Sequence, residues 1–466
     1  MQSSAHRTPA VLIAAPASGQ GKTTLTAALA RLLTRRGHRV RVFKCGPDFL
    51  DPYWHQLASG APVYQLDLWM TGEQDCRQRL AQAAQEADVV LVEGVMGLFD
   101  GTPSAADLAV MLGLPVLAVV DAGSMAGTFG ALAFGLQHYR SGMPWAGVLA
   151  NRAASAGHAD MLRTSLRDPA QWLGALPRDA AFALPERHLG LTVATELPDA
   201  LQRLDAAADA LAQTELGRMS LQDWQRWAVD LALPVTSAMP ATELAAAPLL
   251  RGQRIAVARD SALCFIYQAN LDTLAQLGAE VVFFSPLHDA HLPACDAVWL
   301  PGGYPELHAA QLAANTSLRD DMAVHIAAHK PVWAECGGMM LLFESVQQTD
   351  GSTQPLWGLL PGQVVMQQRL AGLGPQQLQW SVGSGEGGGD GAVHTLRGHT
   401  FHYSRTETPL PPTTYTTRPG TNATSAARTE ALWQQGSVRA SYFHAWFASS
   451  PAATAALLGA EAMEAA

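Results

Sequence analysis

An apolar run turns into a helix where the chain reads Pro331-Val332-Trp333-Ala334-Glu335-Cys336-Gly337-Gly338. The run predicts a strand, and Met339 to Phe343 predicts a helix that follows it without a loop. Such a sharp turn exposes the cysteine and aims the backbone N–H of Gly337 at whatever the sulfur attacks. Helix N-termini stabilise thiolates, and the same donors can hold an oxyanion. The stretch therefore predicts an α/β layer that carries Cys336 as a nucleophile.

Two distant segments supply what a thiol nucleophile needs. Ala297 to Leu300 predicts a strand that runs into Gly302 and Gly303, whose N–H groups can complete an oxyanion hole with Gly337. The best base is His444, which follows a β-like run. A nucleophile and a base that are distant in sequence and close in space are the usual arrangement. We therefore predict Cys336 and His444 as the catalytic pair.

The N-terminal part carries a different chemistry, a phosphate-binding loop. It reads Ala14-Ala15-Pro16-Ala17-Ser18-Gly19-Gln20-Gly21-Lys22-Thr23-Thr24, between a predicted strand and a predicted helix, with Pro16 at the usual position of the first glycine. In such a loop backbone N–H groups surround phosphate oxygens, the lysine reaches the terminal phosphates and the first threonine coordinates Mg²⁺. The residues expected to bind ATP are Ser18, Gly19, Gln20, Gly21, Lys22, Thr23 and Thr24.

Acidic residues that could serve the metal follow two predicted strands. Asp48 lies in the segment Gly46 to Pro52, and Glu93 ends a run of apolar residues. Ligands of doubly wound sheets bind at the carboxyl ends of strands, and Mg²⁺ prefers oxygen ligands. We expect Asp48 and Glu93 at the metal, whereas Asp51 could instead cap the following segment. Asp100, beside a glycine, has an ordinary turn explanation as well as a functional one.

The composition limits the partners and the compartment. A formal net charge of -10 without a lysine- or arginine-rich block argues against a nucleic-acid partner. Five scattered cysteines without a C-x-x-C pair argue against disulfides or structural zinc and for a reducing cytoplasm. Met1 to Pro9 lacks the layout of a signal peptide, and the apolar run Ala10 to Ala15 is too short to span a membrane.

A length of 466 residues, of which 48% are apolar, predicts two domains with buried cores. Strands and helices alternate in both halves, as in doubly wound sheets. We expect an ATP-binding domain over residues 1–235, a linker over 236–252 and a second α/β domain over 253–466. The Gly-rich segment 383–391 predicts a mobile surface loop. The predicted strands are Val11–Ala15, Val40–Lys44, Val89–Glu93, Val116–Asp121, Gly147–Asn151, Ile255–Arg259, Val281–Ser285, Ala297–Leu300 and Pro331–Ala334.

Four segments together resemble the cobyrinic acid a,c-diamide synthase family. The first half is similar to the dethiobiotin-synthetase-like branch of P-loop proteins. The segments around Gly302, Cys336 and His444 resemble a class I glutamine amidotransferase domain. The four segments are Gly21-Lys22-Thr23-Thr24, Gly46-Pro47-Asp48-Phe49-Leu50-Asp51-Pro52, Glu93-Gly94-Val95-Met96-Gly97-Leu98-Phe99-Asp100-Gly101 and Pro185-Glu186-Arg187-His188-Leu189-Gly190-Leu191.

The resemblance implies a cytoplasmic ligase that uses ATP, Mg²⁺ and glutamine. ATP would convert the a and c acetate groups of a corrin-type tetrapyrrole, cobyrinic or hydrogenobyrinic acid, into acyl phosphates that ammonia attacks. Cys336 would release that ammonia from glutamine, and an internal path between the domains would keep it from being protonated. The resemblance implies Thr23, Asp48 and Glu93 as Mg²⁺ ligands, Asn151 on the adenine side of ATP, and Phe49, Leu50, Asp100, Arg187 and His188 near the substrate. A buried, hydrogen-bonded histidine is an equal alternative for His188.

Two positions depart from the family pattern. Many class I amidotransferases orient the histidine with a glutamate two residues later, where this chain has Trp446, and the family usually shows glutamate at the position of Thr400. The group that orients His444 is therefore open. The alternatives are a cobyric acid synthase, a nickel-sirohydrochlorin a,c-diamide synthase, and a P-loop regulatory ATPase with a degenerate amidotransferase module. The sequence leaves open whether the ring carries cobalt and whether the chain forms a homodimer.

Overall fold

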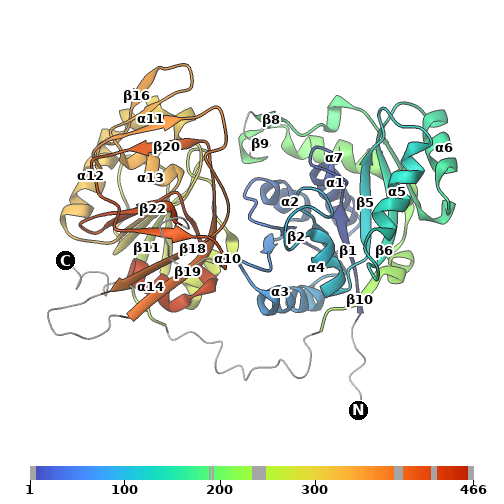
Figure 1. Ribbon diagram of the computed structural model, residues 1–466, viewed down its shortest axis with the longest axis horizontal. Coiled ribbons are helices and arrows are strands. Elements are labelled where there is room, and N and C mark those ends of the chain that lie inside the picture. The colour runs from blue at the N-terminus through green and yellow to red at the C-terminus, as the bar shows by residue number, and fades with distance from the viewer. Residues whose placement is uncertain are drawn as a thin grey trace, which may run out of the picture. The chain divides into compact units, whose positions relative to one another are not determined.

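The computed structural model describes residues 7–187, 190–191, 194–232, 248–382, 392–420 and 428–459. The chain divides into two compact units, Met1–Ala238 and Met239–Ala466 (Figure 1). Most of the predicted linker, residues 236–252, and all of the Gly-rich segment, residues 383–391, lie outside the described residues. No helix of the described ranges is long and apolar enough to cross a membrane.

The first unit contains a parallel sheet with helices on both faces (Figure 1). Its strands are β1 (Arg7–Ala14), β2 (Val40–Cys45), β3 (Tyr64–Leu66), β4 (Val89–Glu93), β5 (Val116–Asp121), β6 (Trp145–Ala153), β7 (Trp172–Pro177) and β10 (Ala228–Asp230). The order is β3-β2-β4-β1-β5-β6-β7, and β10 pairs with β1 in the antiparallel direction. The central position of β1 places the phosphate loop, which follows it, in the middle of the carboxyl edge.

Alternate residues of β1 enter two separate cores, which is why both faces of the sheet are covered. Leu12 packs in one core with residues of α3 to α6, whereas Ile13 packs in the other with residues of α1, α2 and α7 to α9. The predicted doubly wound sheet is confirmed. The helices are α1 (Lys22–Arg35), α2 (Asp51–Ser59), α3 (Glu73–Glu86), α4 (Ala105–Leu112), α5 (Thr128–His138), α6 (Ala156–Ser165), α7 (Ala200–Leu211), α8 (Glu215–Arg218) and α9 (Leu221–Trp224).

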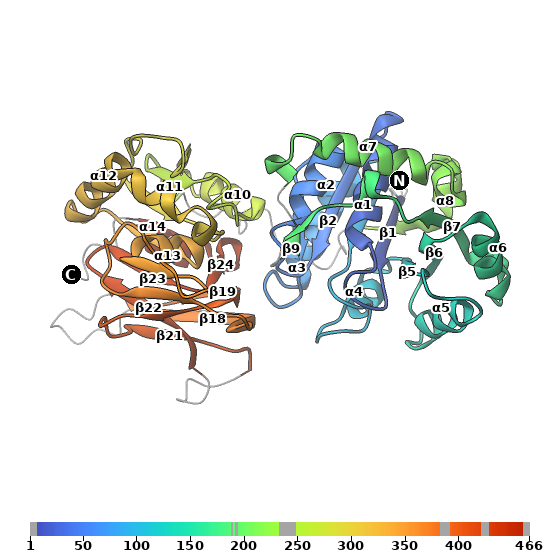
Figure 2. The same ribbon diagram turned by 90° about the horizontal axis from the view of Figure 1, so that it is seen from above.

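The second unit contains a ten-stranded mixed sheet. Its strands are β11 (Arg254–Ala258), β12 (Glu280–Phe284), β13 (Ala297–Leu300), β14 (Val332–Glu335), β18 (Gly372–Val382), β19 (Ala392–His402), β21 (Thr414–Thr417), β22 (Arg428–Gln435), β23 (Val438–Ser441) and β24 (His444–Trp446). The order β12-β11-β13-β14-β23 is parallel, and β22-β21-β18-β19-β24 continues it with antiparallel pairs. Figure 2 shows β23, β22, β21, β18 and β19 side by side. The expected α/β domain is confirmed, with a long antiparallel extension.

Helices also cover both faces of the parallel part of this sheet. Residues of α11 (Ala309–Ala314), α12 (Thr316–Ala327) and α13 (Gly337–Leu342) share one core, and residues of α10 (Gln268–Gln276) and α14 (Pro451–Leu458) share the other. A separate four-stranded sheet consists of β15 (Ser345–Gln347), β16 (Thr353–Pro355), β17 (Gln363–Met366) and β20 (Ser404–Glu407). Because β14 pairs with β23, and β24 follows β23 after two residues, Cys336 and His444 arrive at the same edge.

Candidate active sites

Cys336 lies on the turn between β14 and α13, as the sequence predicts. Its backbone has φ 44° and ψ -107°, a positive φ that is strained for a residue with a Cβ atom. Two hydrogen bonds of 2.8 Å hold the turn: the Cys336 N–H donates to the Ser441 carbonyl, and the Met340 N–H donates to the Cys336 carbonyl. This strained strand-to-helix turn has the geometry of a nucleophile elbow.

The Cys336 side chain is buried, which corrects the expectation that the turn exposes it. Only 5% of the residue is accessible, because it packs in the core that contains α13 and Tyr442. Burial raises the pKa of the Cys336 thiol, the nearby Glu306 carboxyl raises it further, and a hydrogen bond from the Gly337 N–H acts in the opposite direction. The short helix start therefore does not outweigh desolvation, and a neutral thiol needs a base to become a nucleophile.

Three glycines meet beside this turn. A Cβ atom on Gly337 would lie 2.7 Å from the backbone N of Gly303, and a Cβ atom on Gly302 would lie 2.4 Å from Cε1 of His444. Contacts this short do not occur, so a side chain at either position requires the neighbouring atoms to move. The structure thus brings the predicted glycines together with Cys336 and His444.

His444 is surrounded by groups from three strands. It is 1% exposed, and its Nδ1 lies 3.8 Å from Oε2 of Glu335. Its ring stacks on His399, its partner across the β19–β24 pair, with centroids 4.9 Å apart. Trp446 packs against Tyr267 and has only an N–H donor to offer. Sequence analysis did not identify Glu335 as a neighbour of His444; its one signal is its place directly before the nucleophile.

A second buried carboxylate, Glu430 of β22, lies against Thr400 and was also missed by sequence analysis. Its Oε1 accepts a hydrogen bond from the Thr400 hydroxyl at 3.0 Å and lies 3.2 Å from Nε2 of His402. His402 Nδ1 lies 2.8 Å from the Ser404 carbonyl and therefore carries a hydrogen. Glu430 raises the pKa of the Cys336 thiol, so a carboxyl group acts on the nucleophile even though position 400 is a threonine.

The phosphate loop of the first unit ends at Gly21, the N-cap of α1, with φ 95°. A Cβ atom there would lie 2.2 Å from Nδ2 of Asn151, and this amide donates to the Gln20 carbonyl at 2.9 Å. Asn151 thus contacts the loop that the sequence assigns to ATP. Ser18 and Gly19 are exposed, whereas Thr24 is half-buried in the first turn of α1.

The Lys22 ammonium lies between the phosphate loop and the segment that follows β4. Its Nζ donates to the carbonyls of Ala17 at 3.2 Å and Met96 at 2.6 Å. Burial lowers the pKa of Lys22, Glu93 raises it and the neighbouring Lys44 lowers it. The side chain therefore lies where phosphate oxygens could replace two carbonyl groups as its partners.

The two aspartates after β2 make different contacts, and both lie near the Lys44 ammonium. The Thr23 hydroxyl lies 2.8 Å from Oε1 of Glu93 and 3.2 Å from Oδ2 of Asp51. Among the described residues, it makes no hydrogen bond with Asp48. Asp48 Oδ1 accepts the N–H groups of Leu50 at 2.8 Å and Asp51 at 3.1 Å, and its Oδ2 lies 3.7 Å from Lys44 Nζ. A carboxylate that precedes the first helical turn reaches those N–H groups, whereas Asp51, inside the turn, faces β2.

Lys44 and His55 complete this acidic cluster and were missed by sequence analysis. Lys44 Nζ donates to Glu93 Oε1 at 2.8 Å and to Asp51, and His55 Nε2 makes a hydrogen bond with Glu93 Oε2. Burial alone would raise the pKa of Glu93, but Lys44 and His55 hold it well below its usual value. Glu93 is therefore a carboxylate inside the unit, although it has no solvent exposure.

The remaining substrate-side candidates are placed as follows. Asp100 Oδ2 accepts the Gly97 N–H at 2.8 Å, which is the turn explanation that the sequence allowed. Phe49 is buried and Leu50 is half-buried at the start of α2. Arg187 belongs to the short strand β8 (Glu186–Arg187), and His188 lies outside the described residues.

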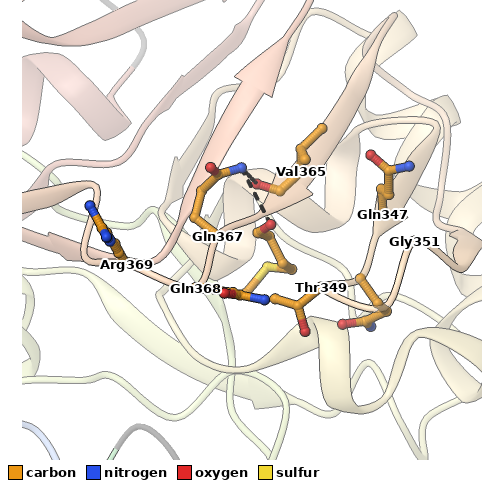
Figure 3. Close-up of a pocket in the computed structure, with 9 residues that line it drawn as sticks. Gln347, Thr349, Gly351, Val365, Gln367, Gln368 and Arg369 are labelled. Carbon is orange, nitrogen blue, oxygen red and sulfur yellow. Dashed lines mark hydrogen bonds between the residues drawn. The ribbon is translucent and has the colours of Figure 1, made fainter.

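A surface pocket of the second unit contains none of the predicted site residues (Figure 3). Gln367 folds its amide back on the carbonyls of Val365 and Met366, at 3.2 and 3.3 Å. The pocket is lined by Gln347, Gln348, Thr349, Gly351, Val365, Met366, Gln367, Gln368 and Arg369. The Gln367 amide in this pocket thus donates to neighbouring backbone carbonyls, and the lining residues do not form a catalytic arrangement.

Comparison with known proteins identifies both units. Residues 11–191 match the CobQ/CobB/MinD/ParA nucleotide binding domain, and residues 254–452 match the CobB/CobQ-like glutamine amidotransferase domain. The chain is 52% identical to a hydrogenobyrinate a,c-diamide synthase of Stutzerimonas stutzeri over 97% of this chain and 98% of that protein. A protein of the same name from Pseudomonas aeruginosa is also 52% identical, with the same coverage.

A cobyrinate a,c-diamide synthase of Herminiimonas arsenicoxydans is 47% identical over 99% of both chains. These relatives span the phosphate loop, the cysteine turn and the histidine strand together. The chain therefore belongs to the cobyrinate and hydrogenobyrinate a,c-diamide synthase family, the family that its sequence resembles.

Proposed function

We propose that the chain is a glutamine-hydrolysing carbon–nitrogen ligase that amidates the a and c acetate groups of cobyrinate or hydrogenobyrinate. The observation that carries the proposal is the presence of two sites in one chain. One is a phosphate loop beside Glu93, and the other is a buried cysteine that shares a strand edge with His444. The family to which the chain belongs supports the ring substrate.

The first unit performs the activation step. A carboxylate oxygen of the ring attacks the γ-phosphorus of ATP, which gives an acyl phosphate and ADP. Ammonia then attacks the acyl carbon and loses a proton. The acyl C–O bond breaks, and inorganic phosphate departs with the former carboxylate oxygen. Lys22 and the N–H groups of the loop stabilise the charge on the transferred phosphoryl group. Each amide consumes one ATP.

The oxygen groups at the start of α1 suit a magnesium ion. Glu93 and Asp51 both contact the Lys44 ammonium, so these carboxylates already bind a positive charge. The Thr23 hydroxyl lies within hydrogen-bond distance of both. We assign Thr23 and Glu93 as Mg²⁺ ligands. Asp51 is the aspartate in contact with Thr23, and Asp48 accepts the backbone N–H groups of Leu50 and Asp51. When bound there, a magnesium ion would neutralise negative charge on the phosphates of ATP.

The second unit releases ammonia. His444 accepts the Cys336 proton as the sulfur attacks the side-chain carbonyl carbon of glutamine. The N–H groups of Gly302, Gly303 and Gly337 hold the oxyanion. His444 then passes the proton to the leaving nitrogen, and ammonia departs from a glutamyl thioester. Water, deprotonated by His444, hydrolyses the thioester to glutamate and restores the thiol.

The test is an incubation of the purified protein with ATP, Mg²⁺, amide-labelled glutamine and either ring. We expect two labelled amides on the a and c acetates, counted by mass spectrometry and placed by fragmentation. A comparison of kcat/KM for the two rings identifies the preferred substrate. Labelling of other side chains would indicate a cobyric acid synthase, and no labelling of either ring would contradict the proposal.

A further inference from the structure

The residue before the nucleophile, Glu335, is the carboxylate that faces the proposed base. It ends β14, is 1% exposed, and its Oε2 lies 3.8 Å from Nδ1 of His444. We propose that Glu335 is a positioning residue, which orients His444 and stabilises its charged form during attack by Cys336. This inference rests on the proposed glutaminase function and deepens it.

Neighbouring donors fix the Glu335 carboxyl in place. Its Oε1 accepts the Trp333 Nε1–H at 2.6 Å and the Ala445 N–H at 3.3 Å. Side chains alternate along a strand, so Trp333 and Glu335 leave β14 on the same face. Ala445 directly follows His444, so one carboxyl oxygen holds the backbone of the histidine strand while the other faces the imidazole. Glu335 thus contacts the histidine strand twice, by a hydrogen bond to its backbone and by an ion-pair contact of 3.8 Å to the His444 ring.

Trp446 occupies the position at which many class I amidotransferases have the glutamate that orients the histidine, and a tryptophan cannot orient it in that way. Trp446 is buried against Tyr267, with ring centroids 5.0 Å apart, and its indole accepts no hydrogen bond. Glu335 is the last residue of β14, directly before Cys336. Its carboxylate therefore faces the imidazole from β14, and not from β24, where Trp446 lies. The group that the sequence left unidentified is thereby present.

The other titratable groups near His444 do not take this place. His399 of β19 lies against the face of the imidazole, and burial together with His444 lowers its pKa, so it is a neutral neighbour. Tyr267 of the segment before α10 contacts His399 Nδ1 at 3.2 Å. Glu306 after β13 and Glu430 of β22 raise the pKa of the Cys336 thiol, as Glu335 also does, and Tyr442 between β23 and β24 lies near them.

A negative charge at Glu335 has a clear use in the reaction. Transfer of the thiol proton creates an imidazolium with almost no contact with water, which is unfavourable without a partner. A carboxylate 3.8 Å from Nδ1 supplies that partner by charge attraction and favours the tautomer with the hydrogen on Nδ1, in which Nε2 is the basic nitrogen. Burial raises the pKa of Glu335, but His444, Trp333 and Ala445 all favour its ionised form.

The decisive variant is Glu335→Gln, which keeps an oxygen acceptor for Trp333 and Ala445 and removes the charge. We expect kcat/KM for glutamine hydrolysis to fall about a hundredfold. The acid limb of the pH profile should move to lower pH by about one unit, because the imidazolium loses its partner. Amidation driven by ammonium should keep its wild-type rate. Wild-type glutamine hydrolysis with an unshifted acid limb would overturn the proposal.

Trp333→Phe is the matched control, because it removes a donor to the same carboxyl but keeps the charge. We expect its acid limb to coincide with that of the wild type, and the same shift in this variant would mean that the role is structural and the proposal wrong. If circular dichroism or denaturant unfolding shows that Glu335→Gln has lost the fold of the second unit, Glu335→Asp decides. A wild-type acid limb in Glu335→Asp supports the proposal, and a shifted one overturns it. If the unmodified protein does not amidate the ring with ammonium, this result contradicts the proposed function and not the role of Glu335.

Discussion

At the scale of single residues, desolvation controls the charges around Cys336. Glu306 is 7% exposed in the turn after β13, and burial raises the pKa of its carboxyl to about 7. An ionised Glu306 raises the pKa of the Cys336 thiol in turn. A carboxyl that changes charge near neutral pH therefore lies beside the proposed nucleophile, where no sequence pattern marked it.

The raised pKa of Glu306 makes the second unit less stable as the pH rises. The folded protein binds this proton more tightly than the unfolded chain, so the contribution is fully present below the ordinary pKa of 4.5 and is lost as the pH rises through about 7. The loss amounts to roughly 3 kcal/mol at most. We expect Glu306→Gln to remove this pH dependence in chemical denaturation at pH 5 and pH 8. The exposed Glu344→Gln should retain it, and an unchanged dependence in Glu306→Gln would show that burial does not control this carboxyl.

At the scale of elements, one helix holds the strand that carries His444. Asn270 of α10 is 1% exposed, and its Nδ2 donates to the Ala445 carbonyl at 2.8 Å. Its Oδ1 accepts the Phe447 N–H at 2.9 Å. A three-residue strand has few ladder hydrogen bonds of its own, so this side chain substitutes for a neighbouring strand on that side of β24.

We expect Asn270→Ala to destabilise the second unit by about 2–3 kcal/mol, because it leaves the buried Ala445 carbonyl of β24 and the Phe447 N–H that follows β24 without partners. Glutamine-driven amidation should fall further than ammonium-driven amidation, because His444 lies on the affected strand. Gln268→Ala on the same helix is the control, and its effect should stay within about 0.5 kcal/mol. Denaturant unfolding and the two amidation assays measure these effects, and equal losses with both nitrogen sources would contradict the local role of Asn270.

At the scale of the whole molecule, two units divide one reaction between them. The phosphate loop with Lys22 and Glu93 lies in the first unit, and Cys336 with His444 lies in the second. Each unit has its own pair of cores on the two faces of its own sheet. A change in one site should therefore leave the fold and the chemistry of the other intact.

Two substitutions test this division. Cys336→Ala should abolish glutamine-driven amidation and leave the ammonium-driven reaction at its wild-type rate, because only the supply of ammonia is lost. Lys22→Ala should abolish amidation with either nitrogen source, because the acyl phosphate no longer forms. Rates with glutamine and with ammonium, measured on both variants, provide the test. Retained glutamine use in Cys336→Ala would refute the nucleophile assignment.

Local pattern was sufficient where an element is apolar and continuous. The sequence predicts β4, β5 and β13 with the bounds that the structure has, because buried parallel strands are unbroken apolar runs. It misses α2, whose first residue is an aspartate before a proline. It also misses the antiparallel strands β18 to β22, where polar residues alternate and pairing partners are distant.

The sequence by itself determined the family, the two α/β layers and the identities of the phosphate loop, the cysteine turn and the histidine. These features depend on contiguous residues, and they can be recognised without knowledge of the distant residues that they contact. Only the tertiary structure decided which carboxylate serves which group: Asp51 rather than Asp48 at Thr23, and Glu335 rather than position 446 at His444. A side chain's partner depends on how separate strands align, and the pairing of β14 with β23 sets that alignment far from any local signal.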